Sequence, residues 1–172
     1  ENTVTDGDRD GGAIYIREQS AAEIRKCKFI ENVADRGGAI TVMEPPRCNI
    51  HHNLFWGNGS RLGGAALSTS GDFEGVPFLI KNCTFVNQHF TGLDASPLTA
   101  NPRGEARIVF SSCIIWDAEP RFSNEELISA SFTNIKDGFE GEENSDADPM
   151  FLKSTEFISS LCMLKGNSPC ID

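Results

Sequence analysis

The sequence lacks several features that would point to a familiar class of protein. No apolar run approaches the roughly 20 residues that a membrane-spanning helix needs. Basic residues are few: 15 Lys and Arg stand against 25 Asp and Glu, which gives a formal net charge of −10. Because nucleic acids and anionic membranes select basic surfaces, we expect neither nucleic acid as a partner nor insertion into a membrane.

Short chemical motifs are missing as well. No Cys-x-x-Cys occurs, which leaves zinc and thioredoxin chemistry with little support. No Gly-x-Ser-x-Gly occurs, and no Ser-His-Asp constellation can be read from the spacing. No window carries the long apolar stripe of a capped amphipathic helix. The sequence therefore predicts no catalytic residue and an all-β fold.

Phenylalanine, glycine and cysteine are abundant instead. Twelve Phe and sixteen Gly among 172 residues are typical of many short packed strands joined by tight turns, and 39% apolar residues suffice for a core. Six Cys favour an oxidising compartment, in keeping with an extracellular or cell-surface location.

Two motifs repeat together along the chain. The sequence Gly-Gly-Ala-Ile at residues 11–14 returns at 37–40, and Gly-Gly-Ala-Ala follows at 63–66, both steps being 26 residues. A second set of columns continues through a fourth copy with steps of 30: Ile24, Ile50, Ile80 and Phe110; Cys27, Asn53, Cys83 and Cys113; Phe29, Phe55, Phe85 and Ile115; Asn32, Asn58, Gln88 and Ala118. Short alternating stretches between Gly, Asn, Asp and Pro predict strands.

A repeat of this length built from short strands is one coil of a parallel β-helix, or solenoid. Stacking the coils at the strand spacing predicts one interior ladder of Phe29, Phe55 and Phe85 and another of Ile24, Ile50, Ile80 and Phe110. It also predicts that Asn32 stacks on Asn58 inside a turn. We expect a single domain over residues 1–172, with about 26–30 residues per coil. Its coils are regular over 1–118, apart from a longer excursion over 87–107, and less regular over 119–172.

The pairing of Gly-Gly-Ala-Ile with Phe-x-x-Asn, at Phe29–Asn32 and Phe55–Asn58, resembles the repeat of polymorphic outer membrane proteins. It also resembles the wider bacterial group of secreted and cell-surface right-handed parallel β-helix proteins. The order of segments after Cys113, ending in Asn167-Ser168-Pro169-Cys170, is similar to that of many secreted members. The resemblance implies a right-handed β-helix on a secreted or cell-surface protein. Because Glu1-Asn2 aligns with Glu31-Asn32 inside a coil, we expect the chain to belong to a longer protein.

An outward strip is the candidate binding surface. If Phe29 and its equivalents point inward, their neighbours point outward. The strip contains Lys28, Ile30, Leu54, Trp56, Thr84, Val86, Ile114 and Trp116. We take Ile30, Leu54, Trp56 and Trp116 as ligand-binding candidates, because sugar rings stack on indole faces and exposed aromatic strips mark binding surfaces. Alternatively, the chain bends after Phe and turns the indoles inward, or the C-terminal segment packs over them.

Calcium is the candidate cofactor. Asp6, Asp8 and Asp10 stand at alternate positions before a Gly, like the opening of a calcium loop. The twelfth position is Arg17 instead of Glu, so an acidic solvated turn is the alternative. A second acidic run, over residues 140–148, reads as a solvated loop. Adjacent His51 and His52 are expected on opposite faces of a strand, which is poor for binding one metal ion.

The cysteines divide into two groups. Cys27, Cys83 and Cys113 fall in one inward column, where in-register spacing favours stacked buried thiols over a disulfide. Cys162 and Cys170 lie eight apart around a turn, and either a bridge or a Cys170 that fills a small apolar position fits that spacing.

Three functions are consistent with these features. The first is a non-catalytic module that binds a glycan or another surface protein. The second is a structural subunit that assembles end to end through open coil ends, since unpaired strand edges invite association. The third is a fragment of a polysaccharide lyase or hydrolase, which a carboxylate or Arg/Lys cluster beside a cleft would favour.

Overall fold

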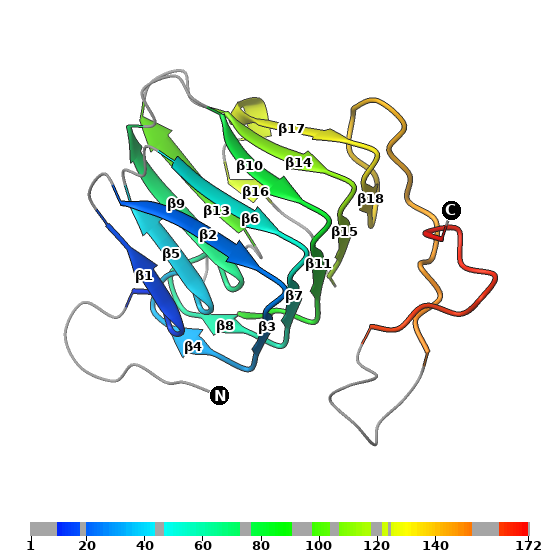
Figure 1. Cartoon of the computed structure of the whole chain (residues 1–172), viewed down its shortest axis with the longest axis horizontal. Coiled ribbons are helices and arrows are strands. Elements are labelled where there is room, and N and C mark those ends of the chain that lie inside the picture. Colours follow the sequence, from blue (N-terminus) through cyan, green and yellow to red (C-terminus); the bar gives the residue numbers. More distant parts are fainter. Residues whose placement is uncertain are drawn as a thin grey trace.

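The fold is all-β and is built from parallel strands (Figure 1). The computed structural model describes nine parts of the chain: residues 10–17, 20–43, 47–72, 77–90, 98–103, 107–117, 122–123, 125–152 and 162–171. Among these residues the one helical element is the 3-10 turn η1 (Glu125–Leu127). No described helix has the length and hydrophobicity needed to cross a membrane.

Four parallel sheets contain all eighteen strands. Sheet 1 consists of β1 (Ile14–Ile16), β5 (Ile40–Met43), β9 (Leu67–Asp72), β13 (Leu98–Arg103) and β16 (Phe122–Ser123). Sheet 2 consists of β2 (Ala21–Arg25), β6 (Arg47–His51), β10 (Phe78–Lys81), β14 (Ile108–Ser111) and β17 (Ile128–Ser131). Sheet 3 consists of β3 (Lys28–Ile30), β7 (Leu54–Trp56), β11 (Thr84–Val86), β15 (Ile114–Trp116) and β18 (Asn134–Ile135). Sheet 4 consists of β4 (Val33–Ala34), β8 (Gly59–Ser60) and β12 (His89–Phe90).

The chain visits the sheets in a fixed order, from sheet 1 to 2 to 3 and, in the first three circuits, to sheet 4. Each circuit lays its strands beside those of the circuit before. In sheet 2 the first four strands keep to the expected steps: Ile24 pairs with Ile50, Ile50 with Ile80, and Ile80 with Phe110. The expected excursion over 87–107 contains β12 and β13 instead, and β13 pairs with β9 over six residues. Pairing extends past residue 118, where β16, β17 and β18 add a fifth circuit to three sheets.

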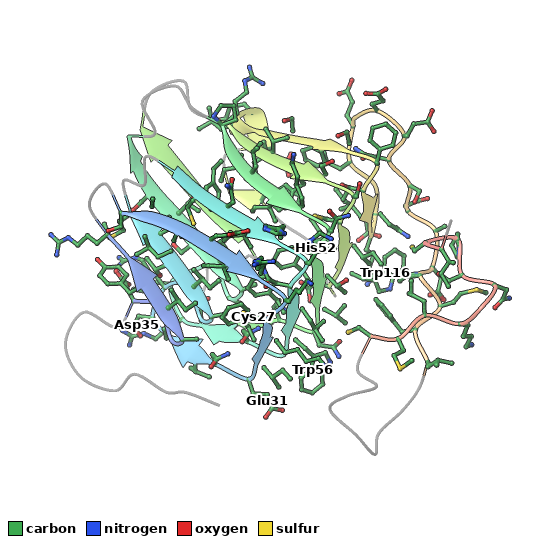
Figure 2. All side chains as sticks on the ribbon, viewed as in Figure 1. Cys27, Glu31, Asp35, His52, Trp56 and Trp116 are labelled. Carbon is green, nitrogen blue, oxygen red and sulfur yellow. The ribbon has the colours of Figure 1, made fainter. Side chains whose placement is uncertain are left out.

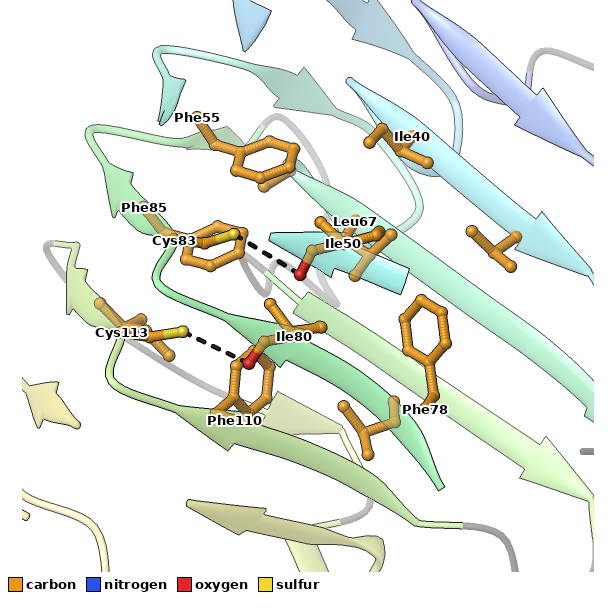
Figure 3. Packing of buried hydrophobic residues seen from close by; sticks show 14 of the residues in the cluster. Ile40, Ile50, Phe55, Leu67, Phe78, Ile80, Cys83, Phe85, Phe110 and Cys113 are labelled. Atoms are coloured by element: carbon orange, nitrogen blue, oxygen red, sulfur yellow. Dashed lines mark hydrogen bonds between the residues drawn. The ribbon is translucent and has the colours of Figure 1, made fainter. Parts of the chain in front are cut away.

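The predicted interior phenylalanine ladder is confirmed. The rings of Phe29 and Phe55 stack with centroids 4.9 Å apart, and those of Phe55 and Phe85 with centroids 4.6 Å apart. All three rings are buried, as is the second predicted column of Ile24, Ile50, Ile80 and Phe110. Figure 3 shows Phe55 and Phe85 beside Ile50, Ile80 and Phe110 in the core. The rings are nearly parallel and one strand apart, so Phe55 packs on the identical side chain of the circuit on either side.

A polar ladder runs beside the phenylalanine ladder. Asn58 Oδ1 accepts from the backbone N–H of Asn32 at 3.1 Å and from its Nδ2 at 2.9 Å. Gln88 Oε1 accepts in the same way from Asn58, at 3.1 and 3.2 Å. The last rung differs from the expected column, because Asp117 Oδ1, and not Ala118, accepts from the Gln88 N–H at 2.7 Å. Each rung thus satisfies the buried backbone N–H of the rung before it.

The Gly-Gly corner shows a one-residue shift that the motif spacing did not predict. Ile14 pairs with Ile40 at a step of 26, but Ile40 pairs with Leu67 at a step of 27. Gly64, and not Gly63, takes the left-handed conformation of Gly37, with φ of 63° against 56°. A Cβ on Gly38 would collide with the carbonyl oxygens of Gly59 and Ala65, so the corner admits no side chain there.

The three cysteines of the predicted inward column are free thiols, as expected, but one of them is exposed instead of buried. Cys83 and Cys113 are buried and unbridged, and burial raises their pKa to about 11 and about 12. Their thiols approach the carbonyls of Ile50 and Ile80 (Figure 3). Cys27 is exposed, contrary to expectation, because it lies between β2 and β3 at the edge of both sheets. Cys162 and Cys170 are free thiols as well.

Removing the middle ring of the phenylalanine ladder tests this packing. Phe55→Ala should lower the free energy of unfolding by about 3–5 kcal/mol, because the circuits above and below hold the cavity open. Urea unfolding followed by circular dichroism measures the change. Phe132→Ala is the control, since that ring is 54% exposed and its loss should cost less than about 0.5 kcal/mol. Equal losses in the two variants would contradict the ladder.

Candidate ligand-binding face

The candidate strip occupies the outer face of sheet 3. Strand pairing places Ile30 beside Trp56, Trp56 beside Val86, and Val86 beside Trp116. A second column on the same face contains Lys28, Leu54, Thr84 and Ile114. The residues between the two columns, Phe29, Phe55, Phe85 and Ile115, are buried in the core. Because side chains alternate along a strand, both columns face away from the core.

The strip is half-buried. Lys28 is exposed, Val86 is 7% exposed, and Leu54, Trp56, Ile114 and Trp116 are intermediate. The two indoles lie two strands apart, which places them about 9.6 Å from each other at the usual strand spacing. Each indole therefore keeps part of its surface accessible while its body packs against the sheet.

The C-terminal segment, residues 136–152 and 162–171, lies against this same face (Figure 1). Burial, with the charge of Asp117 nearby, raises the pKa of the Cys162 thiol to about 11, and Lys28 acts in the opposite direction. Cys162 therefore lies close enough to interact electrostatically with Lys28 on β3 and with Asp117, which follows β15. In Figure 2, Trp116 points from β15 toward the segment. The segment therefore lies on the side of sheet 3 where one of the alternatives placed it.

Hydrogen bonds hold the C-terminal segment in place. The Asn134 amide donates to the carbonyl of Ala147 at 2.7 Å and approaches the Cys170 sulfur at 2.8 Å. The segment folds on itself where the Leu152 N–H donates to the Met163 carbonyl at 2.7 Å. The buried Ser168 hydroxyl donates to the Pro149 carbonyl at 2.6 Å. The segment is thus anchored at β18 and forms one wall beside sheet 3.

A groove of about 780 Å³ lies between this wall and the sheet. Thr84, Ile114 and Asn134 line it from the sheet, and Glu143 and Cys170 line it from the C-terminal segment. Ile114 belongs both to the groove and to the outer face that carries Trp116, so the groove adjoins the strip. The lining is mostly polar, with hydroxyl, amide and carboxylate groups together.

Asp117 is the one strongly perturbed carboxyl that the structure describes. Burial raises its pKa from 3.8 to about 6, and hydrogen bonds from the backbone and the charge of Lys136 act in the opposite direction. Its Oδ1 ends the polar ladder, and its Oδ2 is buried without a described hydrogen-bond partner. Asp117 does not line the groove, so its carboxyl serves the ladder.

The histidine pair departs from expectation. β6 ends at His51, and His52 adopts a left-handed conformation with φ of 56°. This turn brings the two rings together, with their Nδ1 atoms 2.9 Å apart, so they do not point to opposite faces. His51 Nε2 lies 3.0 Å from Glu23 Oε1. The repeat itself could have predicted this turn, because the residue just before the cysteine column adopts the left-handed conformation in every circuit. These residues are Lys26, His52, Asn82, Ser112 and Phe132.

Of the three calcium candidates, the structure describes only Asp10. Asp10 pairs with Arg36, with Oδ1 and Nη1 3.7 Å apart, while Asp6 and Asp8 lie outside the described residues. The side chains of Glu140, Glu142, Glu143, Asp146 and Asp148 are exposed. In the described part of the chain, no group of three or more His, Cys, Asp or Glu side chains is placed to hold a metal ion together.

Sheet 3 therefore brings Ile30, Leu54, Trp56 and Trp116 onto one face, next to a polar groove. No protein family model, no curated protein and no solved structure matches the chain. What the face binds must be inferred from its own chemistry.

Replacing Asp117 tests the electrostatics of the ladder. Since its folded pKa lies above its unfolded value, the folded state binds more protons between about pH 4 and 6, and stability falls as pH rises through that window. Above pH 6 the buried charge costs up to about 3 kcal/mol. Asp117→Asn should therefore raise the free energy of unfolding by about 1–3 kcal/mol at pH 7.5 and change it little at pH 4.

Urea unfolding at the two pH values measures this difference. The asparagine amide matches the other rungs, where Asn58 Nδ2 donates to the Phe29 carbonyl at 3.0 Å. Asp146→Asn is the control, because that carboxyl is exposed. If Asp117→Asn were less stable than the native chain at pH 7.5, the prediction would be wrong, and the negative charge of Asp117 would stabilise the fold.

Proposed function

We propose that this chain is a non-catalytic module of a secreted or cell-surface protein and that it binds glycan across the outer face of sheet 3. The observation that carries the proposal is the column of Ile30, Trp56, Val86 and Trp116 beside an open polar groove. Apolar ring faces and hydroxyl groups are the two surfaces that a sugar presents. The strip suits the ring faces, and the groove suits the hydroxyls.

The proposal includes the finer description of the fold, a right-handed parallel β-helix with about 26–30 residues per coil. Support comes from the fixed order in which the chain visits the sheets and from pairing steps of 26, 27 and 30 residues. The Gly-Gly-Ala-Ile and Phe-x-x-Asn motifs add the resemblance to repeats of polymorphic outer membrane proteins. A stack of this kind presents a long, rigid side wall, and rigid elements position binding groups well.

The spacing of the indoles favours an oligosaccharide over a single sugar. At about 9.6 Å, the two rings are too far apart to sandwich one sugar ring, but both reach one chain that lies across the strands. The acidic groove side chain Glu143 and the net charge of −10 favour a neutral chain over an acidic one. Binding to another surface protein through the same strip is the alternative partner.

Intrinsic fluorescence tests the proposal, because Trp56 and Trp116 are the only tryptophans. Titration with a panel of neutral oligosaccharides should change the emission of the native chain for at least one of them. Trp56→Phe and Trp116→Phe should each weaken that binding about tenfold, since stacking on one indole contributes on the order of 1 kcal/mol or more. Melting temperatures should stay within a few degrees.

A variant that melts far lower with binding unchanged would identify its indole as core. If no oligosaccharide of the panel changes the tryptophan emission, the glycan proposal is contradicted, and the alternative of a protein partner is favoured. Val109→Ala is the control for packing, because Val109 is half-buried on β14 of sheet 2, away from the indole column, and this variant should leave binding unchanged.

End-to-end assembly is a second candidate, and one observation favours it. The first-circuit strands β1, β2, β3 and β4 each stand at the edge of their sheets, with no further strand beyond them among the described residues. Open edges of parallel sheets are templates for pairing with another chain. Sedimentation at increasing concentration distinguishes the two candidates, because assembly through the edges predicts a mass that rises with concentration.

Calcium binding at Asp6, Asp8 and Asp10 also remains a proposal, supported by the alternate spacing of the carboxylates. Binding should be weak, at roughly 10⁻⁴–10⁻³ M, because Arg17 stands where a loop would supply Glu. Millimolar calcium should raise the melting temperature modestly by linkage, and a chelator should reverse the rise. Identical melts with calcium and with chelator would leave a solvated acidic turn.

A further inference from the structure

A second cluster, separate from the proposed glycan face and independent of it, lies at the carboxyl end of β6, where the turn to β7 begins, and includes a residue of the neighbouring strand β2. It consists of His51, His52 and Glu23, and Figure 2 labels His52 near the ends of the sheet 2 strands. The two imidazole rings meet edge to face, with centroids 5.2 Å apart. Neighbouring histidines on a regular strand would diverge, so the left-handed backbone of His52 is what creates the pair.

Glu23 fixes the tautomer of His51. An ionised carboxylate only accepts hydrogen bonds, so His51 Nε2, 3.0 Å from Glu23 Oε1, carries the proton of the neutral ring. The lone pair of His51 is then on Nδ1, which faces His52 Nδ1 at 2.9 Å. In the metal-free protein, His52 Nδ1–H donates to that lone pair. If His52 instead carries its proton on Nε2, both Nδ1 atoms carry lone pairs, and a turn of the exposed His52 ring can direct the two lone pairs toward one ion.

We propose that His51 and His52 chelate one divalent transition-metal ion through their two Nδ1 atoms. Metal–imidazole distances of about 2.0–2.1 Å and a nitrogen separation of 2.9 Å give an angle of about 90° at the ion. That is the cis angle of octahedral and square-planar centres, which suits Ni²⁺ or Cu²⁺ better than tetrahedral Zn²⁺. Glu23 takes the place of the carboxylate that commonly receives the other N–H of a ligating histidine.

The surroundings leave room for the remaining ligands. A groove of about 360 Å³ opens at the pair, lined by His51, His52, Leu79, Lys81 and Asn82 among others. Water or a ligand from outside fills the other coordination positions there. His52 is exposed, so its ring is free to rotate onto an ion, while His51 is held by Glu23.

Neighbouring positive charges weaken the site without removing it. Arg25 and Lys81 flank His51 in the strand pairing. Both side chains are exposed, so solvent screens their charges. Arg25 Nε also lies 3.4 Å from Glu23 Oε1, which offsets its charge. The expected result is a site of modest affinity that competes with protons at acidic pH, because the ligands must be neutral imidazoles.

Calorimetric titration with Ni²⁺ at pH 7.5 tests the proposal. A Cys27→Ser chain is the reference, because Cys27 is an exposed thiol and thiols bind metals themselves. This chain should bind one ion. His51→Ala and His52→Ala in the same background should each lose at least tenfold in affinity, and Glu23→Gln about tenfold through the second shell. His89→Ala should bind like the reference, since it removes a histidine outside the pair.

Nuclear magnetic resonance of the unsubstituted rings provides a readout that does not depend on any histidine variant. Paramagnetic Ni²⁺ should broaden the ring signals of His51 and His52 at substoichiometric amounts, well before those of His89. Absence of saturable binding at millimolar Ni²⁺ would overturn the proposal. Equal affinity in the His51→Ala, His52→Ala and reference chains, or uniform broadening of all three histidines, would overturn it as well.

Discussion

The rest of the structure depends on one constraint: equivalent side chains of successive circuits must stack one strand apart. The Phe29–Phe55–Phe85 ladder and the polar ladder from Asn32 to Asp117 meet this constraint side by side. The first ladder fills the interior, and the second satisfies backbone N–H groups that the turns bury. A slip of one residue would break both together and would turn every core side chain outward. Register is therefore strongly specified, although no single contact is strong.

The same constraint builds the outer surfaces. Because side chains alternate along each strand, fixing Phe55 inside also fixes Leu54 and Trp56 outside. Stacking then repeats the arrangement strand by strand, so Trp56 and Trp116 share a column with Val86 between them. The left-handed turn positions form columns by the same logic, and one of these brings His52 against His51. Both proposed sites follow from the ladders that hold the core.

The sequence predicted what repeats, and missed what departs from the repeat. Period and alternation were enough for the Phe29–Phe55–Phe85 ladder, the Asn32–Asn58 contact and the unbridged Cys83 and Cys113. The 27-residue step at Leu67 escaped prediction because the Gly-Gly motif keeps a step of 26 while the backbone shifts by one residue. Asp117 was missed because the side chain that reaches the ladder follows Gln88 at a step of 29 residues, where the columns of the neighbouring strands keep a step of 30. The position of the C-terminal segment beside sheet 3 depends on contacts such as those of Asn134 with Ala147 and Cys170. These contacts occur once and cannot be predicted from the repeat.

Ring contacts in solution test the stacking most directly. In nuclear Overhauser spectra of a chain with labelled phenylalanine, Phe29 should show contacts to Phe55, and Phe55 to Phe85, since the centroids lie 4.9 and 4.6 Å apart. Phe29 and Phe85 should show none, because the ring of Phe55 lies between them. Absence of the 29–55 and 55–85 contacts, or contacts of Phe55 to residues one position away from these partners, would contradict the register on which both proposed sites depend.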